Sequence, residues 1–138
     1  MLITRGCAYI NGVPQKFTAQ ESFIAALGSP AGSHEVSRSE VKGGTDRSYL
    51  YVGYQSNDSY ENVLNFYDHA LLSRGWKKLS PGASDEKRWC KKYDLFIVRP
   101  REPDAAEKGY TVSIKWHFGE RKPMECYTDL YGIGEDYE

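Results

Sequence analysis

The segment at residues 48–79, SYLYVGYQSNDSYENVLNFYDHALLSRGWKKL, constrains the fold more than any other part of the chain. It reads as a strand, a helix with one apolar face, a helix stop and the start of another strand. The helical period of 3.6 residues is carried by the apolar side chains Tyr60, Val63, Leu64, Tyr67 and Leu71. The sequence therefore predicts a main helix over residues 59–74.

Both ends of this helix carry the expected signals. Asp58 or Ser59 can accept hydrogen bonds from the first free amides, and Asp58 with Glu61 has capping-box spacing. Gly75 can adopt the left-handed conformation that ends a helix, since it has no Cβ atom to clash. Trp76 then follows, where an apolar residue packs back on the last turn. The helical period, the N-cap signal and the glycine stop therefore all predict the same helix.

Two patterns after this helix predict strands. Residues 87–99 carry two apolar clusters separated by charged residues, which fits a hairpin turning near residues 92–94; one long bulged strand is the alternative. Residues 110–118 alternate apolar and polar side chains, so this strand has one buried face and one wet face. The order over residues 48–118 is therefore β-α-β-β-β.

The first third of the chain carries weaker signals. Asn11-Gly12 is a turn signal that predicts a hairpin within residues 2–17, including a strand at VPQKF. A second capping box predicts a short N-terminal helix over residues 19–27. Residues 29–47 are rich in glycine, serine and charge with little periodicity, so we expect a long flexible surface loop there.

These elements predict an α+β fold. A helix with one apolar stripe and strands with one apolar face must bury those surfaces against each other. We expect a single antiparallel sheet with the main helix packed on one face, in one domain spanning residues 1–138. No apolar run approaches the ~18 residues that a membrane span needs, so no membrane span is expected.

The three cysteines, Cys7, Cys90 and Cys126, are widely spaced. The close Cys/His pairs that mark metal sites are missing, so we expect no metal and no cofactor. Reduced, partly buried thiols fit this spacing, and one long-range disulfide is the alternative in an oxidising compartment. The first residues lack a secretory pattern, which predicts a cytoplasmic protein; a periplasmic or outer-membrane-anchored location is the alternative if a signal segment was removed.

Candidate catalytic residues are few. His34, His69 and His117 each lack the second positioned group that acid-base catalysis needs. Residues 41–45 contain glycines and a threonine but not the spacing of a phosphate-binding loop. We therefore expect no enzymatic activity, and a small hydrolase or nuclease using His69 or His117 is the less favoured alternative.

Charge is distributed unevenly. Residues 74–122 hold thirteen basic and seven acidic side chains, spread over turns and wet strand faces, and the whole chain carries −1, so we expect no nucleic-acid partner. The tail at residues 123–138 holds five acidic side chains, no basic one and three tyrosines. Tyrosines anchor interfaces and carboxylates steer a basic partner. We therefore expect partner-binding residues in this tail, and a frayed end is the alternative: Tyr127, Asp129, Tyr131, Glu135, Asp136 and Tyr137.

Residues 58–76 resemble a pattern of many small bacterial proteins, S/D-x-x-E-x-V-x-x-F-Y-x-x-x-L-x-x-x-G-W, set between strands. Proteins of this kind include envelope lipoproteins and small immunity proteins, which neutralise toxins delivered between neighbouring bacteria, as in contact-dependent growth inhibition. The resemblance covers about half of the chain and implies a fold and a bacterial origin. Its motif is structural, so no functional residue is carried over.

These observations predict a non-enzymatic protein-binding domain. The version we expect is an immunity protein that neutralises a cognate toxin by occluding its active site, the partner being a basic toxin domain such as a nuclease. Tyr49, Tyr51 and Tyr54 favour a protein with an adhesive face, although ordinary core and surface roles explain them almost as well. The alternative function is an envelope-associated (lipo)protein accessory domain whose signal segment has been removed.

Overall fold

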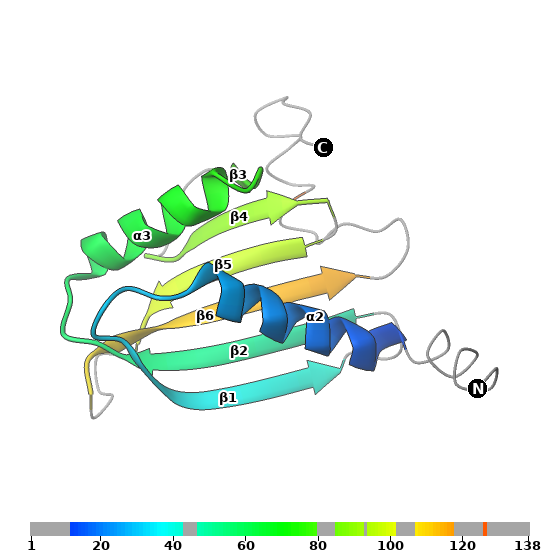
Figure 1. Ribbon diagram of the computed structural model, residues 1–138, viewed down its shortest axis with the longest axis horizontal. Coiled ribbons are helices and arrows are strands. Elements are labelled where there is room, and N and C mark those ends of the chain that lie inside the picture. The colour runs from blue at the N-terminus through cyan, green and yellow to red at the C-terminus, as the bar shows by residue number, and fades with distance from the viewer. Residues whose placement is uncertain are drawn as a thin grey trace.

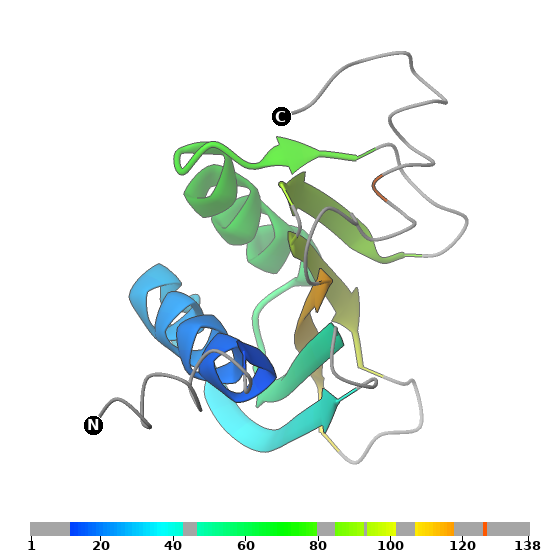
Figure 2. The same ribbon diagram turned by 90° about the vertical axis from the view of Figure 1, so that its right-hand side faces the viewer.

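The computed structural model describes residues 12–42, 47–79, 85–92, 94–101 and 107–117 together with Cys126. Their elements in chain order are α2 (Gly12–Leu27), β1 (His34–Lys42), β2 (Arg47–Gln55), α3 (Tyr60–Leu72), β3 (Lys77–Lys78), β4 (Lys87–Lys91), β5 (Asp94–Pro100) and β6 (Gly109–His117). The strands form one antiparallel sheet in the order β1-β2-β6-β5-β4-β3. Both helices lie on the same face of it (Figure 1, Figure 2). The predicted α+β fold is confirmed.

Helix α3 begins and ends where its sequence signals lie. The Ser59 hydroxyl accepts a hydrogen bond from the N–H of Asn62 at 3.1 Å, so Ser59 is the N-cap. At the other end Gly75 has a φ of +88°, and the N–H of Trp76 donates to the carbonyl of Leu71 at 3.1 Å. These are the features of a Schellman ending, and the main helix is confirmed.

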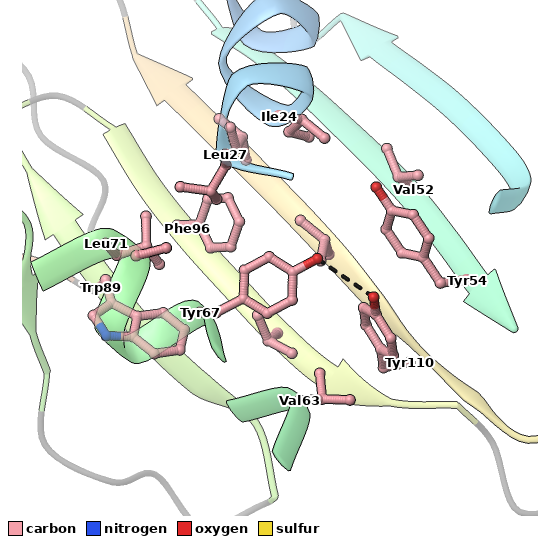
Figure 3. Close-up of a cluster of buried hydrophobic side chains, with 14 of the residues drawn as sticks. Ile24, Leu27, Val52, Tyr54, Val63, Tyr67, Leu71, Trp89, Phe96 and Tyr110 are labelled. Carbon is pink, nitrogen blue, oxygen red and sulfur yellow. Dashed lines mark hydrogen bonds between the residues drawn. The ribbon is translucent and has the colours of Figure 1, made fainter. Parts of the chain in front are cut away.

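The core lies between the helices and the inner face of the sheet (Figure 3). Its centre is Phe96 on β5, which is fully buried. The Phe96 ring contacts four aromatic rings at centroid separations from 5.7 to 6.2 Å, those of Phe23, Tyr67, Trp76 and Trp89. The helices and the central strands are therefore held together by one aromatic cluster.

The strands predicted in the second half are confirmed where the structure describes them. Tyr110, Val112 and Ile114 are buried under the helices, which confirms the predicted apolar face of β6. On its other face Thr111 and Lys115 are half-buried but Ser113 is buried, so the prediction that this whole face is wet is wrong. β4 and β5 form the predicted hairpin, with Lys92 in a left-handed conformation at its turn (φ 56°). The alternative of one bulged strand is therefore wrong.

The flexible loop expected over residues 29–47 is wrong for most of its length. Residues 34–42 form strand β1, which pairs antiparallel with β2 along its whole length. This adds a strand to the predicted β-α-β-β-β order at one edge, and the two-residue β3 adds another at the opposite edge. β1 has no buried face, so its sequence lacks the alternation by which strands are recognised.

The strand predicted at VPQKF is also wrong, because helix α2 begins at Gly12 and includes these residues. Pro14 lies in the first turn of the helix, where its missing N–H removes no helical hydrogen bond. The helix predicted over residues 19–27 is present and is longer than expected.

On the sheet face away from the helices, only some of the described residues are buried. Cys90, Leu95 and Ile97 are buried there together with Leu79 and Cys126. A disulfide bond joins Cys90 to Cys126, so of the two predicted cysteine states the structure has the long-range disulfide. Over β1, β2 and β6 this face carries a different set of residues, which form part of the candidate site.

Candidate partner-binding surface

Strand β1 carries the longest run of exposed side chains among the helices and strands of the described residues. All eight consecutive side chains of residues 34–41 are exposed, so neither face of the strand is covered. β1 is also an edge strand, and β2 is its one neighbour within the described part of the sheet. A sheet strand normally buries at least one face. β1 is therefore held by its backbone ladder rather than by side-chain burial.

A β-bulge shapes this strand. The register between β1 and β2 shifts between Glu35 and Ser37, which leaves Val36 as the extra residue. Gly53 lies opposite: a Cβ atom at Gly53 would come within 2.5 Å of the Ser37 hydroxyl oxygen. Glycine at position 53 therefore leaves room for the Ser37 side chain, which lies over it.

The bulge and the strand's far end expose apolar surface. Val36 and Val41 have exposed fractions of 44% and 41%. Among the described residues the third exposed large hydrophobic side chain is Leu72 on α3, at 47%. Two of the three therefore lie on one strand, which is where a protein partner would gain apolar contact.

Arg38 organises the charges on the helix-facing side of β1. Its Nε and Nη2 atoms donate to the two carboxylate oxygens of Glu35, both at 2.8 Å, and its Nη1 atom donates to Glu21 of α2 at 3.3 Å. The hydrogen bond from Arg38 lowers the pKa of Glu35, and the same bond raises the pKa of Arg38. The Arg38 guanidinium thus donates hydrogen bonds to two carboxylates.

Glu40, two residues along the same side, makes this region acidic. Its pKa is raised, first by a side-chain hydrogen bond with Glu21 and then by burial and by repulsion from the same carboxylate. Three acidic side chains (Glu21, Glu35, Glu40) thus lie around one guanidinium (Arg38), so acidic groups outnumber basic groups here. The helix-facing side of β1 is suited to a cation from a partner.

The opposite side of β1 continues into an aromatic face on β2. Tyr49 and Tyr51 are half-buried there, with ring centroids 6.4 Å apart in an edge-to-face arrangement. Lys115 Nζ lies 5.5 Å from the centroid of the Tyr49 ring. Val41 is paired with Tyr49, so the exposed valine and the two tyrosines are contiguous. Residues 34–41 together with Tyr49, Tyr51 and Lys115 are called the β1 surface below.

The six tail residues predicted to bind a partner lie outside the described residues: Tyr127, Asp129, Tyr131, Glu135, Asp136 and Tyr137. Cys126, the residue before them, is fixed to β4 by the disulfide. Of the three tyrosines considered on β2, Tyr49 and Tyr51 belong to the β1 surface, whereas Tyr54 is buried in the core. Residues 34–41 are the functional candidates that the sequence did not indicate.

The candidate catalytic residues are scattered. His34 is exposed on β1, His69 is exposed on α3, and His117 ends β6. Cys90 is part of the disulfide and is not a free thiol. No group of three or more His, Cys, Asp or Glu residues in the described ranges is placed to hold a metal ion. The three histidines therefore lie on three different elements, β1, α3 and β6.

The buried tyrosines hydrogen-bond to one another rather than to the surface. The hydroxyls of Tyr67 and Tyr110 lie 3.4 Å apart (Figure 3), and the Tyr110 hydroxyl is 2.8 Å from that of Ser33. Burial raises the pKa of Tyr67 and Tyr110, and raises the pKa of Tyr54 to about 12. These hydroxyls therefore stay protonated at physiological pH and stabilise the core.

Comparison of the chain with protein-family models, with curated proteins and with solved structures finds no match. Neither described helix is both long enough and apolar enough to cross a membrane. Function is therefore inferred from the surface of the molecule itself.

Proposed function

We propose that this chain is a non-enzymatic protein-binding domain that takes its partner on the β1 surface. The observation that carries the proposal is the exposure of every side chain from residue 34 to residue 41 in an otherwise well-packed sheet. An edge strand offers backbone N–H and C=O groups to which an extended segment of a partner can add as a further strand. Val36, Val41, Tyr49 and Tyr51 supply the apolar contacts beside that edge.

The partner is proposed to be basic. The acidic balance around Arg38 attracts a cationic surface and speeds association. Glu40 shares its surroundings with the like-charged Glu21, and a lysine or arginine of the partner would relieve that repulsion. A charged edge strand also resists pairing with unrelated strands, so the charges favour one partner over others.

The first version of this function is a bacterial immunity protein. It neutralises a cognate toxin, a basic domain such as a nuclease, by occluding the toxin's active site, and it acts in the cytoplasm. The pattern at residues 58–76 and the acidic side of β1 support this version. The six tail residues named above stay predicted contacts.

The second version is an accessory domain of the cell envelope, and the disulfide favours it. Disulfides persist in oxidising compartments such as the periplasm and are rare in the cytosol. Cys90 and Cys126 are both fully buried, in a cluster with Leu79, Leu95 and Ile97. Mass spectrometry after thiol alkylation in the native cells separates the versions: an intact disulfide supports the envelope, and alkylated thiols support the cytoplasm.

The protein-binding proposal is tested by co-purification with the product of the neighbouring upstream gene. We expect the wild type to form a complex and the Val36→Lys/Val41→Lys variant, which removes the apolar contacts and repels a basic partner, to bind at least about ten-fold more weakly, a change of about 1.4 kcal/mol. Leu72→Lys is the matched control, because Leu72 is as exposed but lies on α3. We expect it to bind within about two-fold of the wild type.

Two results would contradict the proposal. One is the absence of a complex with the wild type, which also removes the immunity version. The other is an equal loss of binding in the Leu72 control and the β1 variant. Circular dichroism of each variant shows whether a loss of binding reflects a loss of fold.

A further inference from the structure

The two sides of strand β1 limit which strand can add to its edge. Residues directly opposite each other on two antiparallel strands point to the same face of the sheet. On β1, Arg38 and Glu40 lie on the helix-facing side, and Ser37, Ser39 and Val41 lie on the other side. An added strand must therefore carry groups that match both sides at once.

One strand that can reach this edge is β1 of a second copy of the chain. A two-fold interface is self-complementary, so that if residue i of one copy lies opposite residue j of the other, j also lies opposite i. Two β1 strands related by a two-fold axis perpendicular to the sheet are antiparallel. Matching faces meet only if the axis passes through a residue, because neighbouring residues point to opposite faces.

The charges on β1 distinguish the possible positions of this axis. With Arg38 on the axis two guanidiniums lie opposite each other, and with Glu40 on the axis two carboxylates do. Like charges directly opposite each other are destabilising. With Ser39 on the axis, Arg38 of each copy lies opposite Glu40 of the other, which gives two pairs of opposite charge. Positions nearer either end of the strand leave fewer of residues 37–41 paired.

The helix-facing groups can accept this register. Arg38 uses three of its five N–H donors for Glu35 and Glu21, so two remain for Glu40 of a second copy. Glu40 is exposed and lies beside the like-charged Glu21. An opposing guanidinium would stabilise its charged form. Charge complementarity therefore supports a second copy at this edge.

The other side of β1 adds apolar contact in the same register. With Ser39 on the axis, Val41 of one copy lies opposite Ser37 of the other and next to Val36 of the bulge. Val36 lies on this side of the sheet, since its Cγ2 atom is 4.0 Å from the position that a Cβ atom would take at Gly53. Val36 and Val41 are 44% and 41% exposed. Pairing would cover both valines of each copy.

We infer that β1 pairs with β1 of a second copy about a two-fold axis through Ser39, which joins the two sheets into one continuous antiparallel sheet. One strand from each copy makes a small interface, and interfaces below about 1,200 Å² are weak or transient. We expect a dissociation constant of about 0.1 mM. At micromolar concentrations the edge is then mostly open, and a second copy and a partner on the β1 surface exclude each other. Only this exclusion rests on the proposed function.

The test is sedimentation equilibrium of the full chain between about 10 µM and about 1 mM, where we expect the mass to rise towards that of a dimer. Arg38→Glu and Glu40→Arg each place like charges opposite each other, so each variant alone should associate at least about ten-fold more weakly. An equimolar mixture of the two variants should associate about as tightly as the wild type, because opposite charges then face each other at both pairs. Damage to the fold of either variant would not be repaired by mixing.

Glu107→Arg is the matched control for Glu40→Arg. It makes the same change in net charge at an exposed residue outside β1. We expect it to associate within about two-fold of the wild type, since exposed charges far from an interface are largely screened.

Cysteine cross-linking tests the register. In a Cys7→Ser background, Ser39→Cys places two thiols directly opposite each other, with Cβ atoms about 4.5–5.5 Å apart. Ser37→Cys is the matched control on the same side of the same strand, and its two thiols are separated by four residues, about 13 Å along the strand. Oxidation should cross-link Ser39→Cys at least about ten-fold faster than Ser37→Cys.

The inference is overturned if the mass stays that of a monomer up to about 1 mM, the weak limit of specific affinity. It is also overturned if the mixture of charge variants associates no better than either alone, or if Ser37→Cys cross-links as fast as Ser39→Cys. A monomer that captures the upstream gene's product would overturn this inference and leave the proposed function standing. A dimer that captures no partner would contradict only the proposed function.

Discussion

Strands β5 and β1 belong to the same sheet, yet their surroundings are opposite. In β5 the four consecutive residues 95–98 are all buried, because the helices cover one face and the cluster around the disulfide covers the other. In β1 the eight consecutive residues 34–41 are all exposed. The difference teaches that a strand can be held either by burial or by its ladder alone. Only a strand with a buried face needs apolar side chains at regular positions, so only such a strand can be recognised from its sequence pattern.

The same contrast separates stability from binding. Burial of apolar surface supplies most of the free energy of folding, so stability resides in β5 and the elements packed on it. β1 contributes little apolar burial, so the packing of the core does not restrict which side chains it carries, and these can be suited to a partner. Changes in β5 should therefore alter unfolding, and changes in β1 should alter binding.

The largest expected effect comes from the centre of the core. Phe96→Ala removes a ring that contacts four other rings and leaves a cavity, so we expect a loss of about 3–5 kcal/mol in the free energy of unfolding. Val41→Ala on β1 is the control and should change it by no more than about 0.5 kcal/mol. Urea unfolding measures both. Similar losses of unfolding free energy in the two variants would contradict the claim that stability resides in β5 and not in β1.

The second effect concerns the outer cover of β5. Cys90→Ala with Cys126→Ala removes a cross-link between residues 36 apart in the sequence, for which we expect a loss of about 2–4 kcal/mol. Thermal unfolding of the double variant, and of the wild type with and without a reductant, measures it. A wild type whose unfolding is unchanged by reductant would show that the outer face is held without the bond.

A smaller effect appears at alkaline pH. The pKa of Tyr54 is raised by burial to about 12, so its contribution to stability is complete below pH 10 and is lost as the pH rises through about 12. Tyr54→Phe keeps the ring stacked on Tyr110 and removes the ionisable group. The free energy of unfolding, measured in urea, should fall less steeply between pH 9 and pH 12 in the variant than in the wild type. The same dependence on pH in the wild type and in Tyr54→Phe would contradict the burial of this hydroxyl.

The smallest effect is expected on β1 itself. The raised pKa of Glu40 means that its contribution to stability is present below pH 4.5 and is lost as the pH rises through the shifted value. Glu40→Gln should therefore be slightly more stable than the wild type at pH 7, by less than about 0.5 kcal/mol at this exposed site. Thermal unfolding at pH 4 and pH 7 measures the difference. A clear loss of stability in the variant at pH 7 would sink this account of the charges.

The parts of the fold that the sequence predicts are those with local signals. The N-cap, the apolar stripe and the glycine stop of α3 lie within a few residues of one another, and the alternation in β6 reports one buried face. Strand β1 is not predicted from the sequence, because its backbone hydrogen bonds to β2 hold it in the sheet and do not require a pattern of apolar and polar side chains. The start of α2 is not predicted, because Asn11-Gly12 is a turn signal that indicates a hairpin where the structure has a helix from Gly12.

The candidate sites depend on contacts between distant residues. Gln20, Trp76 and Lys91 line one hollow of about 280 Å³ although they are far apart in the chain, and no spacing in the sequence indicates this. The cysteine spacing left the thiol and disulfide states open until the fold brought the Cα atoms of Cys90 and Cys126 to 6.1 Å. Residues 34–41 are candidates because they are exposed, and no pattern in the sequence indicates that exposure.

The most direct test of the central claim is hydrogen–deuterium exchange of the protein alone and in complex with the upstream gene's product. In the free protein we expect amides of β5 and β6 to exchange slowly and the outward amides of β1 to exchange fast. On binding, exchange should slow in β1 and beside Tyr49 and Tyr51, with β5 unchanged. Slowed exchange confined to other elements, with β1 as fast as in the free protein, would contradict the claim that β1 binds the partner.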